Sequence, residues 1–174
     1  MSNADQPTMP SFLGIECGGT KSVAILAQGS GRQAVQLEAG PANLRLLSDP
    51  DLVAHFRKIS AIHKNSAPPV AVAIGMAGAR TEMDRQRIRN AAATVWPGAC
   101  LYATNDLETA LIAAQIADDR ERPRVLVLSG TGSCCYGQTP EGKTAKVGGW
   151  GHFIGDKGSG YEIGLRALKA VVYY

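Results

Sequence analysis

The sequence contains no long apolar run, and this absence limits what the protein can be. Spanning a bilayer as a helix takes about 20 consecutive apolar residues, and no stretch of the chain reaches that length. The first eleven residues also lack the basic start and the apolar core of a secretion signal. The sequence therefore predicts a cytoplasmic protein that has no membrane partner.

Cysteine and histidine are scarce, with four and three residues respectively. The cysteines form no CxxC pair and show no spacing to histidine that is typical of a zinc site; they are Cys17, Cys100, Cys134 and Cys135. Neither a structural zinc site nor a disulfide framework is predicted. Reduced and mostly buried thiols are expected instead. Cys134 and Cys135 should point to opposite faces if their segment is a strand.

Charge of either sign is also low. The 174 residues carry a net charge of +3, and 19% of them are charged, whereas 45% are hydrophobic. Lysines and arginines are scattered, with short clusters only at 85–89 and 120–124, so no nucleic-acid partner is predicted. The composition is that of a globular chain with a core, long enough for one domain or for one domain and part of another.

Glycine, in contrast, is abundant, and its distribution organises the chain. Seven of the 20 glycines fall between Gly148 and Gly164, among Trp, His and Asp residues. Because glycine loses more conformational entropy on ordering than any other residue, such a run needs a reason in the backbone. Close approach of the main chain to a bound ligand is that reason here. Two shorter glycine turns, at 16–20 and 129–133, are expected to act with this segment.

Turn signals and hydrophobic periodicity predict a regular alternation of strands and helices. The run Val70–Met76 is continuously apolar, which indicates a strand buried on both faces. Ser48 and Thr81 have the residue type and position of helix N-caps. Strands are expected at 12–16, 22–27, 33–39, 70–76, 101–104, 124–129, 134–137 and 145–147, and helices at 49–62, 82–95, 107–117 and 162–174.

These elements form two units with one plan. The first runs strand-turn-strand-strand, a three-strand meander, and then alternates helices with strands; the second repeats strand-turn-strand-strand-helix. This order predicts an α/β fold of the doubly wound kind, with ligands at the carboxyl ends of strands. We expect a disordered tail over 1–11, one domain over 12–122 and the opening part of a second, similar domain over 123–174. The charged stretch 118–123 is the expected linker.

The turn that contains Gly18 and Gly19 can bind an anion. A tight glycine hairpin exposes backbone N–H groups, and Thr20 adds a hydroxyl donor. An ordinary hairpin turn is the alternative reading, both here and at 129–133. Neither the Walker-type nor the dinucleotide-type glycine pattern is present, because both need a helix directly after the turn.

Asp106 follows a predicted buried strand, where a carboxylate can accept the proton of an attacking hydroxyl group. An N-cap for the helix from Leu107 is the alternative role. Asn43 lies in a loop after the third strand, where asparagine is a common turn residue. Trp150 offers a flat apolar face, and His152 is better read as a loop-stabilising hydrogen-bond partner than as a catalyst.

Three glycine motifs and an intervening Asn105-Asp106 resemble a known family, the BadF/BadG/BcrA/BcrD-type ATPases. The motifs are Gly14-Ile15-Glu16-Cys17-Gly18-Gly19-Thr20-Lys21, Leu128-Ser129-Gly130-Thr131-Gly132-Ser133 and the segment Gly148–Ser159. The resemblance runs from Phe12 to the end of the chain. It implies a ribonuclease H-like, actin-type ATPase fold and the cofactors ATP and Mg²⁺. It also implies phosphorylation of an amino sugar, most closely N-acetylglucosamine to its 6-phosphate.

The resemblance further implies roles for single residues. Asp106 would be the catalytic base, and Glu16 would lie near the Mg²⁺ and hold it through water. The phosphates of ATP would be bound by Gly18, Gly19, Thr20, Lys21, Gly130, Thr131 and Gly132. The amino sugar would be bound by Asn43, Asp106, Ser133, Cys134, Gly149, Trp150, Gly151, His152, Phe153 and Asp156.

The chain departs from the family pattern at Lys157, where many relatives have glutamate, and at Cys134, where asparagine or an aliphatic residue is commoner. The exact sugar therefore stays open, and glucosamine kinase is an alternative. Two others are an activator ATPase, whose cysteines should hold an iron–sulfur cluster across a dimer, and a non-catalytic sugar sensor. A homodimer is left open. Because relatives continue well past this length, we expect a fragment without the adenosine contacts. Whether this fragment is active by itself is left open.

Overall fold

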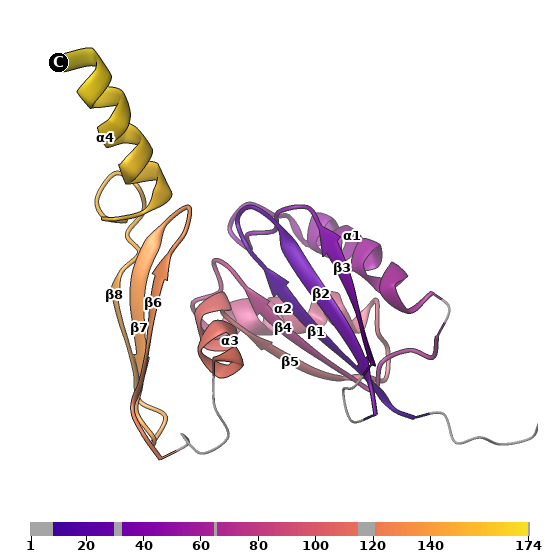
Figure 1. Cartoon of the computed structure of the whole chain (residues 1–174). Coiled ribbons are helices and arrows are strands. Elements are labelled where there is room, and N and C mark those ends of the chain that lie inside the picture. The colour runs from indigo at the N-terminus through magenta and orange to yellow at the C-terminus, as the bar shows by residue number, and fades with distance from the viewer. Residues whose placement is uncertain (1–8, 30–32, 65, 115–120, 174) are drawn as a thin grey trace, which may run out of the picture. The chain divides into compact units, whose positions relative to one another are not determined.

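A computed structural model describes residues 9–29, 33–64, 66–114 and 121–173 of the chain. The chain divides into two compact units, Met1–Thr109 and Ala110–Tyr174 (Figure 1). The first unit contains the meander and the alternating helices and strands, except that the third helix, Asp106–Ala113, continues past Thr109. Residues 1–8 of the predicted tail, 118–120 of the predicted linker and 115–117 of the predicted helix 107–117 lie outside the described residues. Ser11, which the sequence placed in the tail, is the buried first residue of a strand.

The first unit is built on a mixed five-stranded sheet. Its strand order is β3-β2-β1-β4-β5, in which β2 pairs antiparallel with β1 and β3, and β4 pairs parallel with β1 and β5. The strands are β1 Ser11–Cys17, β2 Ser22–Gln28, β3 Gln33–Ala39, β4 Ala71–Met76 and β5 Cys100–Thr104. The three-strand meander followed by parallel strands is the predicted α/β architecture.

Two helices cover one face of this sheet, and both begin at the predicted caps. In α1, Asp49–Ser60, the Ser48 side chain accepts a hydrogen bond from the Asp51 N–H. In α2, Glu82–Ala93, Thr81 and Asp84 form a capping box, so two backbone N–H groups that the helix leaves unpaired are satisfied. A short 3₁₀ helix, η1 Ala61–His63, extends α1.

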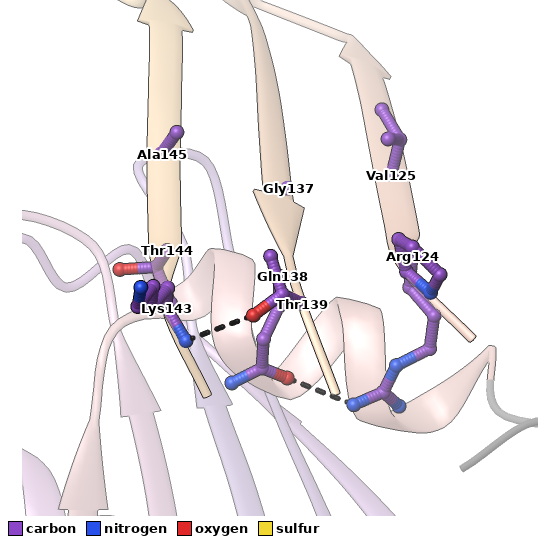
Figure 2. A pocket seen from close by; sticks show the side chains of 9 residues that line it. Arg124, Val125, Gly137, Gln138, Thr139, Lys143, Thr144 and Ala145 are labelled. Carbon is purple, nitrogen blue, oxygen red and sulfur yellow. Dashed lines mark hydrogen bonds between the residues drawn. The ribbon is translucent and has the colours of Figure 1, made fainter. Parts of the chain in front are cut away.

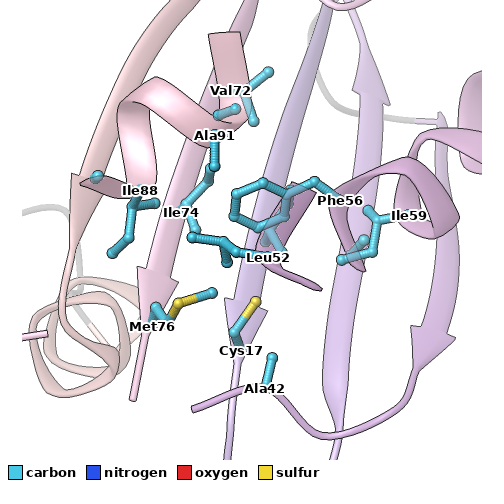
Figure 3. Packing of buried hydrophobic residues seen from close by; sticks show 14 of the residues in the cluster. Cys17, Ala42, Leu52, Phe56, Ile59, Val72, Ile74, Met76, Ile88 and Ala91 are labelled. Atoms are coloured by element: carbon cyan, nitrogen blue, oxygen red, sulfur yellow. The ribbon is translucent and has the colours of Figure 1, made fainter. Parts of the chain in front are cut away.

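The core lies between this sheet face and the two helices (Figure 3). Alternate residues of β1 are buried, and α1 buries residues at helical spacing. Phe56 of α1 stacks at a tilt on Trp96, with ring centroids 5.8 Å apart. The largest fully buried side chains are Trp96, Phe56, Leu13, Leu44, Leu52, Ile59, Ile74, Met76, Ile88 and Val72.

The prediction that β4 is buried on both faces is correct only near its end. Val72, Ile74 and Met76 face the core, whereas Ala73 on the other face is exposed. Gly75, also on that other face, is buried against Thr109 of the third helix, α3 Asp106–Ala113. Burial on both faces is confined to Gly75 because α3 covers the second face of β4 only there, while α1 and α2 cover the first.

The second unit is an antiparallel three-stranded meander with one helix. The sheet order is β6-β7-β8, and the elements are β6 Arg124–Ser129, β7 Ser133–Gln138, β8 Thr144–Gly148 and α4 Gly160–Tyr173. Among its described residues, only Leu111 at the end of α3, Tyr136 and Ser159 are buried. This unit therefore presents apolar strand and helix faces without a core of its own.

The cysteines are all free, as expected, but the prediction that they are mostly buried is wrong. Only Cys17 is buried, while Cys100 and Cys135 are exposed and Cys134 is half-buried. Cys17 faces the core of the first unit, whereas the other three lie on strands whose faces are poorly covered. In the part of the chain that the structure describes, no helix combines the length and apolarity needed to cross a membrane.

Candidate active site

Three parallel strands of the first unit end at one edge of the sheet. In the register, Glu16 of β1 is the partner of Gly75 of β4, and Gly75 is the partner of Thr104 of β5. Because neighbouring strands lie about 4.8 Å apart, the backbones of Glu16 and Thr104 are about 10 Å apart. The segments that follow these strands contain most of the site residues predicted for this unit. The fold therefore brings Glu16, the first glycine turn and Asp106 to a common edge.

The first glycine turn is an exposed four-residue loop between β1 and β2. The Gly18 N–H donates to the Lys21 carbonyl over 2.9 Å, while Gly19 and Thr20 face solvent. A Cβ on Gly18 would lie 3.0 Å from the Lys21 carbonyl oxygen, whereas Gly19 has open space around it. The steric need for glycine thus applies to Gly18 alone. Open space at Gly19 leaves its backbone accessible to a ligand.

Lys21 of this turn is engaged by an acidic side chain. Its Nζ lies 2.8 Å from Oε1 of Glu38 on β3, and both side chains are more than half exposed. An exposed pair of this kind is worth little and is readily exchanged for another anion. Lys21 can therefore turn to a phosphate at small cost.

A buried polar pair supports the base of the turn. Ser22, which is paired with Cys17 across β1 and β2, lies 3.0 Å from Nε2 of His55 on α1. Burial raises the pKa of the Cys17 thiol to about 12, although the hydrogen bond with Ser22 acts in the opposite direction. Burial and the nearby Lys58 lower the pKa of His55. The support under the turn is thus uncharged at neutral pH.

Sequence reasoning missed this support. The position of His55 beside the apolar residues Leu52, Phe56 and Ile59 of α1 was a signal that the histidine faces the core. Which side chain His55 contacts there depends on how the strands pair, and hydrophobic periodicity gives no information about that pairing.

Asn43 lies at the same edge as the glycine turn. It forms a parallel bridge with Ala77, directly after β4, and its Oδ1 accepts a hydrogen bond from the Arg45 N–H over 3.0 Å. A Cβ on Gly78, whose φ is +86°, would lie 2.4 Å from this oxygen. The turn role of Asn43 is therefore real. It uses Oδ1 and leaves Nδ2 as the group that can donate to a hydroxyl.

An ionic link holds the Asn43 loop against α2. The Arg45 guanidinium donates to the Gly78 carbonyl over 3.0 Å and to Oδ2 of Asp84 over 2.5 Å. Burial disfavours the ionised form of Asp84, but hydrogen bonds from the backbone N–H groups of Arg80 and Thr81 outweigh it and lower its pKa. The carboxylate thus caps α2 and anchors the loop at once.

Asp106 is the half-buried first residue of α3. The alternative that Asp106 caps this helix is not supported, because Oδ1 of Asn105 accepts the hydrogen bond from the Glu108 N–H over 2.8 Å. The helix consequently begins one residue earlier than predicted. The cap position belongs to Asn105, and Asp106 stands one residue further along the chain.

In the second unit, the glycine turn and the glycine-rich segment pack against each other. The Gly160 N–H donates to the Gly130 carbonyl over 2.8 Å, and the Ser133 hydroxyl donates to the Lys157 carbonyl over 2.8 Å. A Cβ on Gly132 would lie 3.0 Å from Oδ2 of Asp156. Two motifs that are about 25 residues apart in sequence therefore form one surface.

The aromatic residues of this segment lie on that surface and are exposed. The side chains of Trp150 and Phe153 are 74% and 91% exposed. The His152 ring contacts the rings of Phe153 and Tyr161, with centroids 4.2 and 4.8 Å apart. Cys134 adjoins this loop, because a Cβ on Gly149 would lie 3.1 Å from its Cβ. Trp150 thus offers an open apolar face, and His152 has stacking partners within its own segment.

Two cavities of the described residues are lined by none of the predicted site residues. One, of about 500 Å³, lies between α1 and α2. The other, of about 260 Å³, lies at the end of the second sheet opposite the Gly130 turn, where Arg124 donates to Gln138 (Figure 2). Among the described residues no three His, Cys, Asp or Glu side chains form a metal-binding group. A lone Glu16 carboxylate suits an Mg²⁺ ion held mainly by phosphates and water.

Comparison with known proteins agrees with the predicted family and fold. The chain is 31% identical over 169 residues to the N-acetylmuramic acid/N-acetylglucosamine kinase of Clostridium acetobutylicum, covering 94% of this chain and 54% of that protein. It is 26% identical to the glucosamine kinase GspK of Vibrio cholerae, covering 94% and 55%. The chain thus spans about half the length of the curated relatives it matches.

A solved structure gives the same result. The crystal structure of a candidate N-acetylglucosamine kinase from Chromobacterium violaceum superposes with a TM-score of 0.72 at 27% identity, covering 94% of this chain and 57% of that one. The predicted α/β actin-type ATPase fold is thereby confirmed. The model of the BadF/BadG/BcrA/BcrD ATPase family matches residues 13–173. The chain therefore belongs to the BadF/BadG/BcrA/BcrD ATPase family.

Proposed function

We propose that this chain contributes the phosphate-binding turns and the sugar-binding residues of an ATP-dependent amino-sugar kinase. N-acetylglucosamine is the proposed acceptor and its 6-phosphate the product. The observation that carries the proposal is the strand register, which aligns Glu16, Gly75 and Thr104 and so gathers the first glycine turn and Asp106 at one sheet edge. The kinase names of the relatives support the reaction class.

In this proposal each group has one chemical task. The N–H groups at Gly19–Thr20 and at Thr131–Gly132 would bind the phosphates of ATP, in turns closed by the Gly18 and Gly130 N–H groups, which donate to the Lys21 and Gly132 carbonyls. An Mg²⁺ ion near Glu16 would neutralise developing charge on those phosphates. Asp106 would accept the proton of the primary hydroxyl as that oxygen attacks the γ-phosphorus, and ADP would leave.

The sugar contacts follow from the polar and aromatic groups. Nδ2 of Asn43 would donate to a ring hydroxyl, and Asp156 would accept from another. The exposed Trp150 ring would stack on the apolar face of the pyranose, with Gly149, Gly151, Phe153, Ser133 and Cys134 around it. Binding of both substrates would exclude water and limit ATP hydrolysis.

A coupled assay of ADP release with a panel of sugars tests this function. With protein expressed from the complete gene, we expect the highest kcat/KM for N-acetylglucosamine. Higher values for glucosamine would favour the relative from Vibrio cholerae as the guide to substrate. A brown, iron-containing preparation would favour the activator-type ATPase instead. Absence of ADP release with every sugar, despite sugar binding, would identify a sensor and contradict the proposal.

Two adjacent substitutions separate catalysis from helix capping. Asp106→Ala should lower kcat at least about 100-fold, because a general base is lost. Asn105→Ala should cost at least about 1 kcal/mol of unfolding free energy, because the cap of α3 and the Nδ2 donor to Glu108 are both lost. Urea unfolding and steady-state kinetics on both variants check these values. Unchanged turnover in Asp106→Ala would exclude this residue as the base.

A further inference from the structure

Glu108, two residues after Asp106, accepts hydrogen bonds from three side chains, and the proposed kinase chemistry does not use it. Its Oε1 accepts hydrogen bonds from Nη2 of Arg85 over 3.0 Å and from Nδ2 of Asn105 over 3.1 Å. Its Oε2 accepts from the hydroxyl of Thr104. The partners come from α2, from the end of β5 and from the residue directly before Asp106. One side chain therefore connects three segments around the proposed base.

The burial of this group makes the arrangement costly unless every contact is kept. The side chain of Glu108 is 18% exposed, that of Arg85 is 32% exposed, and Thr104 is fully buried. A carboxylate taken out of water is stable only where donors replace the lost hydration. The side chains of Arg85, Asn105 and Thr104 replace this hydration, and all three can do so only in the arrangement observed. Loss of any of them leaves an incompletely solvated charge, so the turn is held in a single arrangement.

A second contact fixes the same turn from the side of the sheet. The side chain of Thr109 lies against Gly75 of β4 so closely that a Cβ on Gly75 would lie 2.3 Å from the Thr109 hydroxyl oxygen. That hydroxyl donates to the Asp106 carbonyl over 2.9 Å. The backbone of Asp106 is thus fixed by the contact with β4, and its orientation relative to α2 is set through Glu108.

We propose that Glu108, held by Arg85, is a positioning residue that orients the carboxylate of Asp106 toward the acceptor hydroxyl. This inference rests on the proposed function. It assigns the pair Arg85–Glu108 a catalytic consequence, although neither residue is one of the proposed substrate-binding residues. A misplacement of about 1 Å at a reacting group can cost on the order of 100-fold in rate, which is why such a support matters.

A purely structural role for Glu108 is the rival explanation, because a carboxylate at the third position of a helix stabilises its first turn. The two roles differ in their dependence on Asp106. If the role is structural, replacing Glu108 lowers kcat or the stability of the fold whether or not Asp106 is present. A positioning role acts through the base, so its effect on rate disappears once Asp106 is replaced.

The test is a double-mutant cycle on kcat in protein expressed from the complete gene. We expect Glu108→Gln to lower kcat by about 10- to 100-fold with the KM for ATP changed less than about twofold. In an Asp106→Asn background, the same substitution should lower kcat by less than about twofold further. An equal loss in both backgrounds would overturn the inference, and so would unchanged kcat in Glu108→Gln alone.

The chain offers a matched control for the ion pair. Glu82 also pairs with Arg85, at 3.7 Å, and its side chain is 68% exposed. Glu82→Gln removes the other acidic partner of the same arginine and should leave kcat within about twofold of the wild-type value. Arg85→Met should reproduce the loss seen with Glu108→Gln. A loss of kcat in Glu82→Gln as large as that in Glu108→Gln would contradict the assignment.

A measurement that needs no activity separates failure of this inference from failure of the proposed function. Side-chain scalar couplings of Asp106, measured by NMR on the 174-residue chain, should report one χ1 rotamer in the wild type and averaging in Glu108→Gln. If the wild type phosphorylates no sugar, the proposed function fails, and the couplings still decide the positioning role. Identical couplings in both proteins would overturn it.

Discussion

At the scale of single residues, function and packing are divided between neighbours. Asn105 caps α3 and Asp106 does not, so the carboxylate proposed as the base is not also required as the helix cap. Oδ1 of Asn43 serves a turn while its amide nitrogen remains as a donor. In both places a group with a structural role lies next to a group with a proposed chemical role. Asn105 precedes Asp106, and within Asn43 the Oδ1 atom is next to Nδ2. Residue type alone could not separate the two roles.

Cys17 gives a prediction at this scale. Because its pKa is raised to about 12 by burial, only about one thiol in 10⁴ would be ionised at pH 8, where an ordinary thiol is substantially ionised. Cys100 and Cys135, which are exposed, should react with a thiol reagent within minutes, whereas Cys17 should react only after denaturation. Mass spectrometry of labelled peptides measures this difference. Labelling of native Cys17 at the rate of Cys100 would contradict its burial.

At the scale of elements, the close approach of α3 to β4 decides where Asp106 stands. The α3 helix lies on the face of the sheet opposite α1 and α2, and its contact with the strand needs a residue without a side chain at Gly75. The apolar run 70–76 predicted the strand but not this helix contact. A glycine within a strand is a known sign of close backbone approach.

Gly75→Ala is therefore expected to displace α3. The added Cβ would lie 2.3 Å from Oγ1 of Thr109, so we expect a loss of about 1–3 kcal/mol in unfolding free energy, as for other overpacked sites. Gly40→Ala is the matched control, because that position has open space and should change the unfolding free energy by less than about 0.5 kcal/mol. Urea denaturation compares the two. Equal stability of both variants would show that the contact is not tight.

At the scale of the whole molecule, the two units differ in what they bury. The first has a continuous core between a five-stranded sheet and two helices. In the second, Val125, Val127 and Val147 are between 70% and 73% exposed, and none of the described residues of α4 is buried. Burial of apolar surface is the main term that offsets conformational entropy. The second unit consequently buries little apolar surface of its own to offset the conformational entropy that it loses on folding.

Amide hydrogen exchange should therefore differ between the units of this chain. We expect the amides of β1 and β4 to exchange at least about 100-fold more slowly than those of β6 and β8, because local stability follows buried contacts. Exchange followed by mass spectrometry of peptides measures the ratio. Equal protection in the two sheets would mean that the second unit is stabilised by contacts beyond those described for it.

The sequence by itself determined the order of elements, both helix caps, the glycine turns and the family, because these depend on residues close together in the chain or on motifs with fixed spacing. The predicted roles of single site residues stay predictions. Only the tertiary structure decided that Asn105 rather than Asp106 caps α3, that His55 and Ser22 support the first turn, and that Arg85 meets Glu108. The physical reason is that such contacts depend on which segments pack together, and local periodicity and propensity carry no record of that choice.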